Sequence, residues 1–166
     1  PEEAGFDPRR FVDHSHPAVR EEAYRLLFRG GAEPGLVAEG LRDSAPRVVR
    51  AALAAAGPDP REPVLEHVLD LLDDPVDEKT ERAAVRAVSR SDDPRVRDRL
   101  IDRCREHRFL WRLFRGPLAP PGPVALESLA VLAAGPFDDG TVEKLVEAAR
   151  ASDDESYRRA AEGRRP

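Results

Sequence analysis

Residues 48–57, VVRAALAAAG, decide the fold that this sequence predicts. Related stretches lie on both sides of them, as VREEAYRLLFRG from Val19 and as TERAAVRAVSRS from Thr80. When Val19, Val49 and Thr80 are aligned, the copies are offset by 30 and 31 residues, and a weaker copy, SYRRAAEG, follows from Ser156. A recurrence of this length predicts one small structural unit that is repeated along the chain.

A turn of acidic or small residues precedes each copy. The turns read DHSHP at 13–17, RDSAP at 42–46, LDDP at 72–75 and ASDDES at 151–156. Side-chain oxygens of Asp and Ser cap the free backbone N–H groups at a helix start, and Pro at the first helical position sacrifices no hydrogen bond. Each copy is therefore predicted to begin a helix.

A second helix is predicted in each unit, over 34–43, 60–74, 94–107 and 139–152. Apolar residues recur in these ranges at three- and four-residue spacing, and the two clearest stripes are Val64, Leu65, Val68, Leu69 and Leu72, and Val96, Leu100, Ile101 and Cys104. No stretch keeps the alternation of a strand over more than four residues. The sequence thus predicts an all-α protein built from antiparallel helical hairpins in a row.

The motif P-x-V-R, at the start of the first helix of a unit of about 30 residues, resembles the HEAT-like repeats, especially the short repeats of bilin lyases. The residues that carry the resemblance are Pro17, Val19, Arg20, Ala23, Val49, Arg50, Leu53, Asp92, Pro94, Val96, Arg97, Tyr157, Arg158 and Ala160. They span roughly 14–107 and 124–161. The resemblance implies a right-handed α-solenoid of four to five units whose inner surface binds other macromolecules, and it implies no activity.

Two features depart from the motif. Thr80-Glu81 stands where the motif has Val-Arg, and DDPRVR at 92–97 opens a predicted second helix, which leaves the register within 76–123 open by one helix. The interval from Thr80 to Tyr157 is 77 residues, whereas two repeats would take about 60. We therefore expect one repeat domain, 1–166, interrupted by an insertion at 107–123 and forming a segment of a longer chain.

The formal net charge of -5 argues against nucleic acid and anionic lipid as partners. No apolar run approaches the ~18 residues that span a bilayer, so the expectation is a cytoplasmic protein without a membrane partner. Lys79 and Lys144 are the only lysines beside 25 arginines, a composition typical of a GC-rich bacterial genome.

The candidates for catalysis or metal binding all have simpler structural interpretations. Four Asp-Asp pairs, at 73–74, 92–93, 138–139 and 153–154, are interpreted as helix caps. His14 and His16 lack a third and fourth zinc ligand at suitable spacing, and Cys104 lies on an apolar stripe, where a buried thiol is expected. No nucleophile elbow or phosphate-binding glycine loop is present. We therefore predict no enzyme, no cofactor and no metal.

Residues 105–123, REHRFLWRLFRGPLAPPGP, gather three of the chain's nine aromatic residues. If helix 94–106 continues through 115, Arg105, Arg108, Arg112 and Arg115 share one helical face, with Trp111 among the apolar residues around it. This arginine ridge would bind an acidic partner, phosphates or nucleic acid, or else it is the solvated strip of a helix packed on two sides.

The function that these features favour is a non-enzymatic scaffold that docks another protein. The predicted partner-binding residues are Glu39, Arg42, Glu66 and Asp70 on the second helices, together with Arg105, Arg108, Trp111, Arg112 and Arg115. The alternative is a nucleic-acid-binding protein that resembles the alkylpurine DNA glycosylases, which also build on HEAT-like helices. Handling of a bilin chromophore is a third possibility, and it rests on the repeat type alone.

Overall fold

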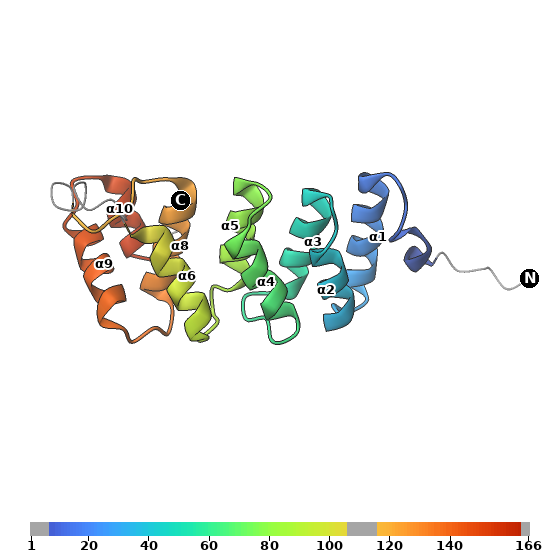
Figure 1. Ribbon diagram of the computed structural model, residues 1–166, viewed down its shortest axis with the longest axis horizontal. Coiled ribbons are helices and arrows are strands. Elements are labelled where there is room, and N and C mark those ends of the chain that lie inside the picture. The colour runs from blue at the N-terminus through green and yellow to red at the C-terminus, as the bar shows by residue number, and fades with distance from the viewer. Residues whose placement is uncertain (1–6, 106–115, 164–166) are drawn as a thin grey trace, which may run out of the picture.

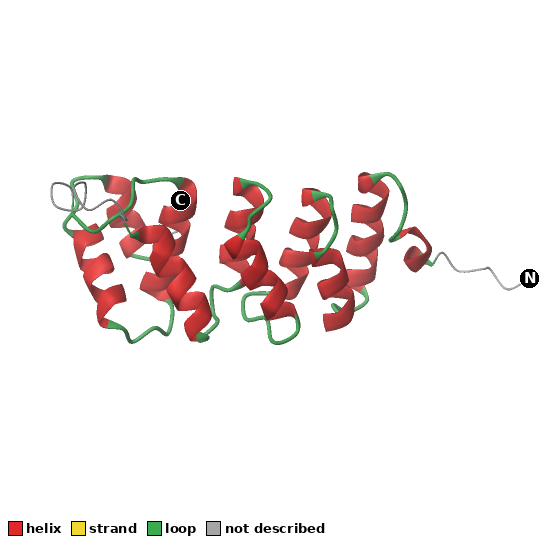
Figure 2. Cartoon of the chain, in the orientation of Figure 1, coloured by secondary structure: helices red, strands yellow, loops and turns green. Residues whose placement is uncertain are grey.

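The computed structural model describes residues 7–105 and 116–163, and in these ranges all regular elements are helical (Figure 2). A short 3-10 helix, η1, spans Pro8–Phe11. The α-helices are α1 (Pro17–Arg29), α2 (Pro34–Leu41), α3 (Pro46–Ala56), α4 (Val64–Asp73), α5 (Glu78–Ala87), α6 (Pro94–Cys104), α8 (Pro123–Ala134), α9 (Gly140–Arg150) and α10 (Glu155–Ala161). The prediction of an all-α chain is confirmed for the described residues.

The predicted order of first and second helices is also found. Thr80 lies in α5 and Tyr157 in α10, and the stretch 92–97 opens α6, which gives the register that the sequence left open within 76–123. The bounds of the second helices are shorter than predicted, because α4 begins at Val64 after Pro63, and α6 ends at Cys104. The predicted range 60–74 therefore extends beyond α4 at both ends, and the range 94–107 extends beyond the C-terminal end of α6.

Acidic side chains cap the N-termini of several helices. The Oδ1 atoms of Asp93, Asp139 and Asp154 each accept a hydrogen bond at 2.8 Å from a backbone N–H of the first turn that follows. The capping interpretation is wrong for Asp73 and Asp74, because Asp73 is the last residue of α4 and Asp74 follows it. The cap of α5 is instead Asp77, which accepts from the N–H of Thr80 at 2.6 Å.

The helices form two rows along the long axis of the molecule (Figure 1). One row contains the first helices, in which α1 contacts α3, α3 contacts α5, α5 contacts α8 and α8 contacts α10. The other row contains the second helices, in which α2 contacts α4, α4 contacts α6 and α6 contacts α9. The rows pack on each other through the pairs α2 with α3, α4 with α5 and α6 with α8.

A continuous apolar core lies between the two rows. It extends from Val37 in α2 to Ala161 in α10. The helix α8 is buried over all of 126–132, because α5, α6, α9 and α10 all contact it. The rows approach closely at Gly40, where a Cβ atom would lie 3.0 Å from the Cβ of Ala52, so only glycine lets α2 and α3 come this near.

Arginines at equivalent positions of the first two units form ion pairs with the turn that begins the next unit. Arg20 of α1 donates to both carboxylate oxygens of Asp43 at 2.7 Å, and this pair lowers the pKa of Asp43. Arg50 of α3 likewise donates to Asp77 at 3.2 Å. In α5 the aligned residue is Glu81, which instead accepts a hydrogen bond from Arg103 of α6 at 2.8 Å. The departure from Val-Arg at this position thus replaces an ion pair to the turn before the next unit by an ion pair within one hairpin.

Candidate partner-binding surface

The second helices turn a charged face outward, as the sequence predicts. Glu39 of α2, Arg42 directly after it, and Glu66 and Asp70 of α4 are all exposed. The exposure of these predicted residues is confirmed. Their placement follows from the helical period, since the opposite stripe of α4 is buried in the core as Val64, Leu65, Val68, Leu69 and Leu72.

The outward face of α4 carries a row of carboxylates. Glu62 just before the helix, and Glu66, Asp70 and Asp73 within it, follow one another at spacings of four, four and three residues. These spacings place side chains on one helical face. Neither Lys nor Arg occurs in α4 itself, so cations for these carboxylates must come from other elements.

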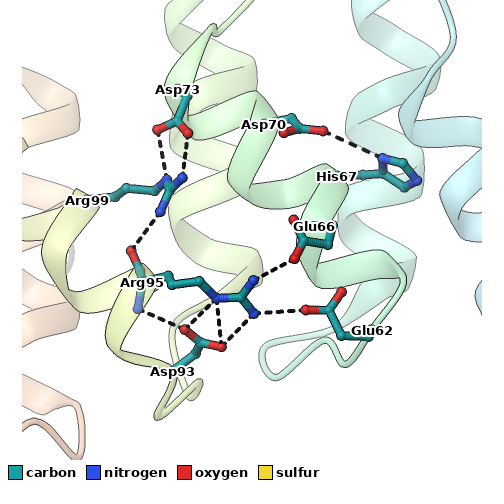
Figure 3. A network of polar contacts seen from close by, with 8 residues as sticks. All are labelled: Glu62, Glu66, His67, Asp70, Asp73, Asp93, Arg95 and Arg99. Atoms are coloured by element: carbon teal, nitrogen blue, oxygen red, sulfur yellow. Dashed lines mark hydrogen bonds and ion pairs between the residues drawn. The ribbon is translucent and has the colours of Figure 1, made fainter.

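Arg95 at the start of α6 supplies one such cation (Figure 3). Its two terminal nitrogens donate to Glu66 Oε1 at 2.5 Å and to Glu62 Oε1 at 2.8 Å, and the second also donates to Asp93 Oδ2 at 2.8 Å. Hydrogen bonds from Arg95 to Asp93, Glu62 and Glu66 raise the pKa of its guanidinium above the usual value. Glu66 is therefore already engaged within the molecule.

Two further arginines of α6 continue this connection to α4. Arg99 donates to Asp73 through Nε at 2.8 Å and through a terminal nitrogen at 2.5 Å, a bidentate geometry that fixes both side chains. Arg103 donates to the backbone carbonyl of Leu72 as well as to Glu81. The spacing of four residues between successive arginines puts all three on one face of α6.

The carboxylate of Asp70 is left facing solvent. Its side chain is 78 % exposed, and the imidazole Nδ1 of His67 lies 3.8 Å from Asp70 Oδ2. Glu39 on the neighbouring helix makes no ion pair with a described residue and lies near the phenol of Tyr24, whose pKa is raised first by burial and then by Glu39. Asp70 and Glu39 are thus the predicted acidic residues that remain available to a partner.

The arginine ridge was predicted on the premise that the helix beginning at Pro94 continues through residue 115, and this premise is wrong. The helix α6 ends at Cys104, and Arg105 is extended, with φ of -92° and ψ of 132°. Arg105 pairs in an isolated antiparallel bridge with Leu118, and the N–H of Ala119 donates to the carbonyl of Cys104 at 2.8 Å. This return of the chain supplies hydrogen bonds that a continuing helix would have made. Arg105 therefore does not extend the face of α6, although its side chain is exposed.

The remaining ridge residues lie outside the described ranges. They are Arg108, Trp111, Arg112 and Arg115. The binding role predicted for them stays a prediction.

Cys104 is buried, as expected. Its thiol lies 3.5 Å from the carbonyl oxygen of Ala125, and burial raises its pKa to about 12. The reactive thiolate is therefore scarce at neutral pH. His16 acts as a helix cap, since its Nδ1 accepts from the N–H of Ala18 at 3.3 Å. Within 7–105 and 116–163, no three His, Cys, Asp or Glu side chains converge in a way that could hold a metal ion.

Arg95, Arg99 and Arg103 are the residues of this surface that the sequence interpretation missed. The available signal was their spacing, because arginines four residues apart on one helix match carboxylates four residues apart on another. The sequence does not say which two helices lie side by side, so the pairing needed the fold.

Within the described ranges, no helix combines the length and the apolarity that a bilayer crossing requires. A scan against protein-family models finds no match for the chain, and a search of curated proteins finds none either.

Proposed function

We propose that this chain is a HEAT-like α-solenoid that acts as a scaffold and docks a partner protein on its row of second helices. The observation that carries the proposal is the order of helix contacts, in which each first helix meets the next first helix and each second helix the next second helix. Such one-dimensional stacking of two-helix units is typical of repeat proteins, whose extended surfaces serve binding.

The docking surface is the outward face of α2 and α4 around Glu39 and Asp70. Both side chains are exposed, and in the described residues neither forms an ion pair with an arginine or a lysine. Complementary charge on a partner would steer association and fix its orientation more than it would add affinity. The partner face that fits is therefore one that carries arginine or lysine.

A photo-crosslinking experiment tests this proposal. A benzophenone amino acid is introduced at Asp70 or at Glu39, in the full-length protein within its native cells, and covalent adducts are resolved by gel and mass spectrometry. Because both sites lie on the docking surface, we expect discrete adducts to one protein from each. The matched control is Asp153, which is exposed in the turn before α10 and lies away from α2 and α4.

Charge reversal supplies the second arm. Asp70→Lys combined with Glu39→Lys reverses the charge of the two carboxylates that pair with no arginine, so it breaks no ion pair to arginine. For this comparison the benzophenone amino acid is introduced at neighbouring Arg42. The yield of covalent adducts from that site is expected to fall at least fivefold in the charge-reversed variant. Equal yields from the reversed and unchanged proteins, or the same adducts from Asp153, would contradict docking on this face.

A further inference from the structure

A second surface lies on the row of first helices, away from the acidic face of α4. It is a groove whose α1–α3 part is lined by Arg25, Arg29 and Arg47 and whose α3–α5 part is lined by Arg86 and Arg90. Arg50 and Ala54 of α3 line both parts, so the two hollows adjoin along α3, and we call them together the alanine valley.

The shape of the valley follows from side-chain length. Its floor on α3 is formed by Ala51, Ala54 and Ala55, each of which ends at a methyl group. At the position of Ala55, the flanking helices carry long arginine side chains, Arg25 on α1 and Arg86 on α5. The valley therefore runs along α3, between a wall on α1 and a wall on α5.

Positive charge dominates the lining. Six arginines line the valley, Arg25, Arg29, Arg47, Arg50, Arg86 and Arg90, and Glu21 is the single acidic residue among the lining residues. Glu21 contacts Arg25 at 2.9 Å and Arg47 at 3.2 Å. Arg25 also lies 4.0 Å from Glu22, so these two arginines are balanced by two carboxylates, and an excess of positive charge must come from the other arginines.

Two of the other arginines form ion pairs with carboxylates of the same chain. Arg50 contacts Asp77 at 3.2 Å, and Arg86 donates to the buried carboxylate of Glu127. Arg29, the last residue of α1, and Arg90, just after α5, make no ion pair with a described residue, and both are exposed. They are the cations best placed to accept an external carboxylate.

General helix dimensions leave room for one α-helix above α3. Packed helices lie about 8–10 Å apart, so the axes of α1 and α5, on either side of α3, are roughly 16–20 Å apart. An α-helix with its side chains is about 10–12 Å across. One helix therefore fits above α3, with its small apolar residues on the alanine floor and its flanks beside the arginine walls.

We propose that the alanine valley binds an acidic amphipathic helix of a partner protein. This inference deepens the proposed scaffold function, on which it rests, and it names the chemistry of a partner on the opposite row of helices. The recognition mode is a helix in a groove, where an apolar stripe anchors and flanking charges select the partner. Carboxylates at both flanks of the ligand helix would meet Arg29 on one side and Arg90 on the other.

Single-stranded nucleic acid is the competing ligand for an arginine-lined groove. Sites for single strands combine cations with aromatic side chains on which bases stack. The floor of this valley on α3 offers methyl groups, which suit an aliphatic helix face. Phe28 of α1 is the one aromatic residue among the lining residues, and its ring packs against Tyr24, so the lining holds no series of aromatic rings on which successive bases could stack. The overall charge of -5 also opposes binding to a polyanion.

The test is a titration of fluorescein-labelled probes by fluorescence anisotropy, in low and in moderate salt. The first probe is a 20-residue helical peptide with an Ala/Leu stripe flanked by glutamates. The second has glutamine at every glutamate position, and the third is a 20-nucleotide single strand. We expect binding of the first peptide and at least tenfold weaker binding of the second.

Two variants and one control locate the site. Arg29→Glu with Arg90→Glu is expected to weaken binding of the acidic peptide at least tenfold, and neither change breaks an ion pair to a described residue. Ala54→Gln fills the floor without changing charge and is expected to weaken binding at least fivefold. The control is Arg150→Glu, an exposed arginine that also ends its helix, α9, and it should leave the affinity unchanged.

Circular dichroism establishes that each variant is folded before titration. Equal affinity for the two peptides, or full binding by the Arg29→Glu/Arg90→Glu variant, would overturn the proposal. Tighter binding of the single strand than of the acidic peptide, insensitive to Ala54→Gln, would overturn it in favour of nucleic acid. Because crosslinking at Glu39 and Asp70 probes the other row, a failure here is distinguishable from a failure of the scaffold function.

Discussion

The buried carboxylate of Glu127 allows a quantitative prediction for stability. This residue of α8 is 0 % exposed, and its carboxylate accepts hydrogen bonds from Arg86 at 2.8 and 2.9 Å and from Arg82 at 3.2 Å. The two arginines come from α5, so the cluster joins α5 to α8. Glu127→Gln keeps the volume and removes the charge that both guanidinium groups contact.

The magnitude follows from the number of bonds and the exposure of the donors. A hydrogen bond to a charged group contributes about 1.5–3 kcal/mol, and breaking a fully buried pair costs about 3–5 kcal/mol. Here the side chains of Arg82 and Arg86 are 27 % and 46 % exposed, so water partly solvates them after the change. We therefore expect a loss of about 2 kcal/mol at neutral pH, which corresponds to a fall in Tm of roughly 4–8 °C for a chain of this size.

The effect has a defined pH dependence. Burial raises the pKa of Glu127, but hydrogen bonds and charges from Arg86 and Arg82 outweigh burial and hold the pKa below its usual value. A carboxyl whose pKa is lowered on folding stabilises the protein above its unfolded pKa of about 4.3, and this contribution is lost as the pH falls through the folded pKa. The difference between wild type and Glu127→Gln should therefore be full at pH 7 and shrink below about pH 4.

The assay is urea denaturation followed by circular dichroism at pH 7 and at several acidic values. Glu147→Gln is the matched control, since Glu147 is exposed on α9 and makes no ion pair with a described residue. It should change stability by less than about 0.5 kcal/mol. A Glu127→Gln protein as stable as wild type at pH 7, or a deficit that persists undiminished in acid, would refute the assigned role of this cluster.

Three further predictions concern other parts of the core. Gly40→Ala should lower the free energy of unfolding by about 1 kcal/mol, because the cost of overpacking against Ala52 exceeds the gain in helix propensity. Gly35→Ala has open space around it and should not lower the free energy of unfolding, and urea denaturation compares the two variants. Arg20→Ala should lower the urea midpoint, since its guanidinium binds both carboxylate oxygens of Asp43. Cys104 should react with a thiol reagent far more slowly in the native protein than in denaturant; equal rates would contradict its burial.

The helix order could be predicted from the sequence because local signals define it. Proline and a capping side chain mark helix starts, and apolar spacing marks the buried stripes, so the start of α6 at Pro94 after Asp93 was predictable, whereas the start of α5, without proline and capped by Asp77, was not located. The reason for the departure at Thr80-Glu81 became visible only in the fold, where Glu81 accepts from Arg103, 22 residues away.

The end of α6 could not be predicted because long-range contacts decide it. Residues 105–115 contain good helix formers and no proline, so the local pattern favours continuation. Backbone groups of Leu118 and Ala119 pair with Arg105 and Cys104 instead. Partners brought in by the later chain thus outweigh local propensity.

The exposure of the charged residues on the candidate surface could be predicted from the sequence, but the ion pairs that they form could not. The period of α4 places Glu66 and Asp70 outward, and both are exposed. The sequence did not distinguish them, although Glu66 is bound by Arg95 and Asp70 contacts no arginine in the described residues. That distinction depends on which helix lies beside α4.

Hydrogen exchange of the Gly40→Ala variant tests the repeat architecture most directly. In a stack of units that contact mainly their neighbours, stability is a sum of local terms, so a change at one end remains local. The account predicts faster amide exchange in α1, α2 and α3 and unchanged exchange in α9 and α10. Equal acceleration throughout the described helices would contradict a repeat array and, with it, the scaffold function proposed for this chain.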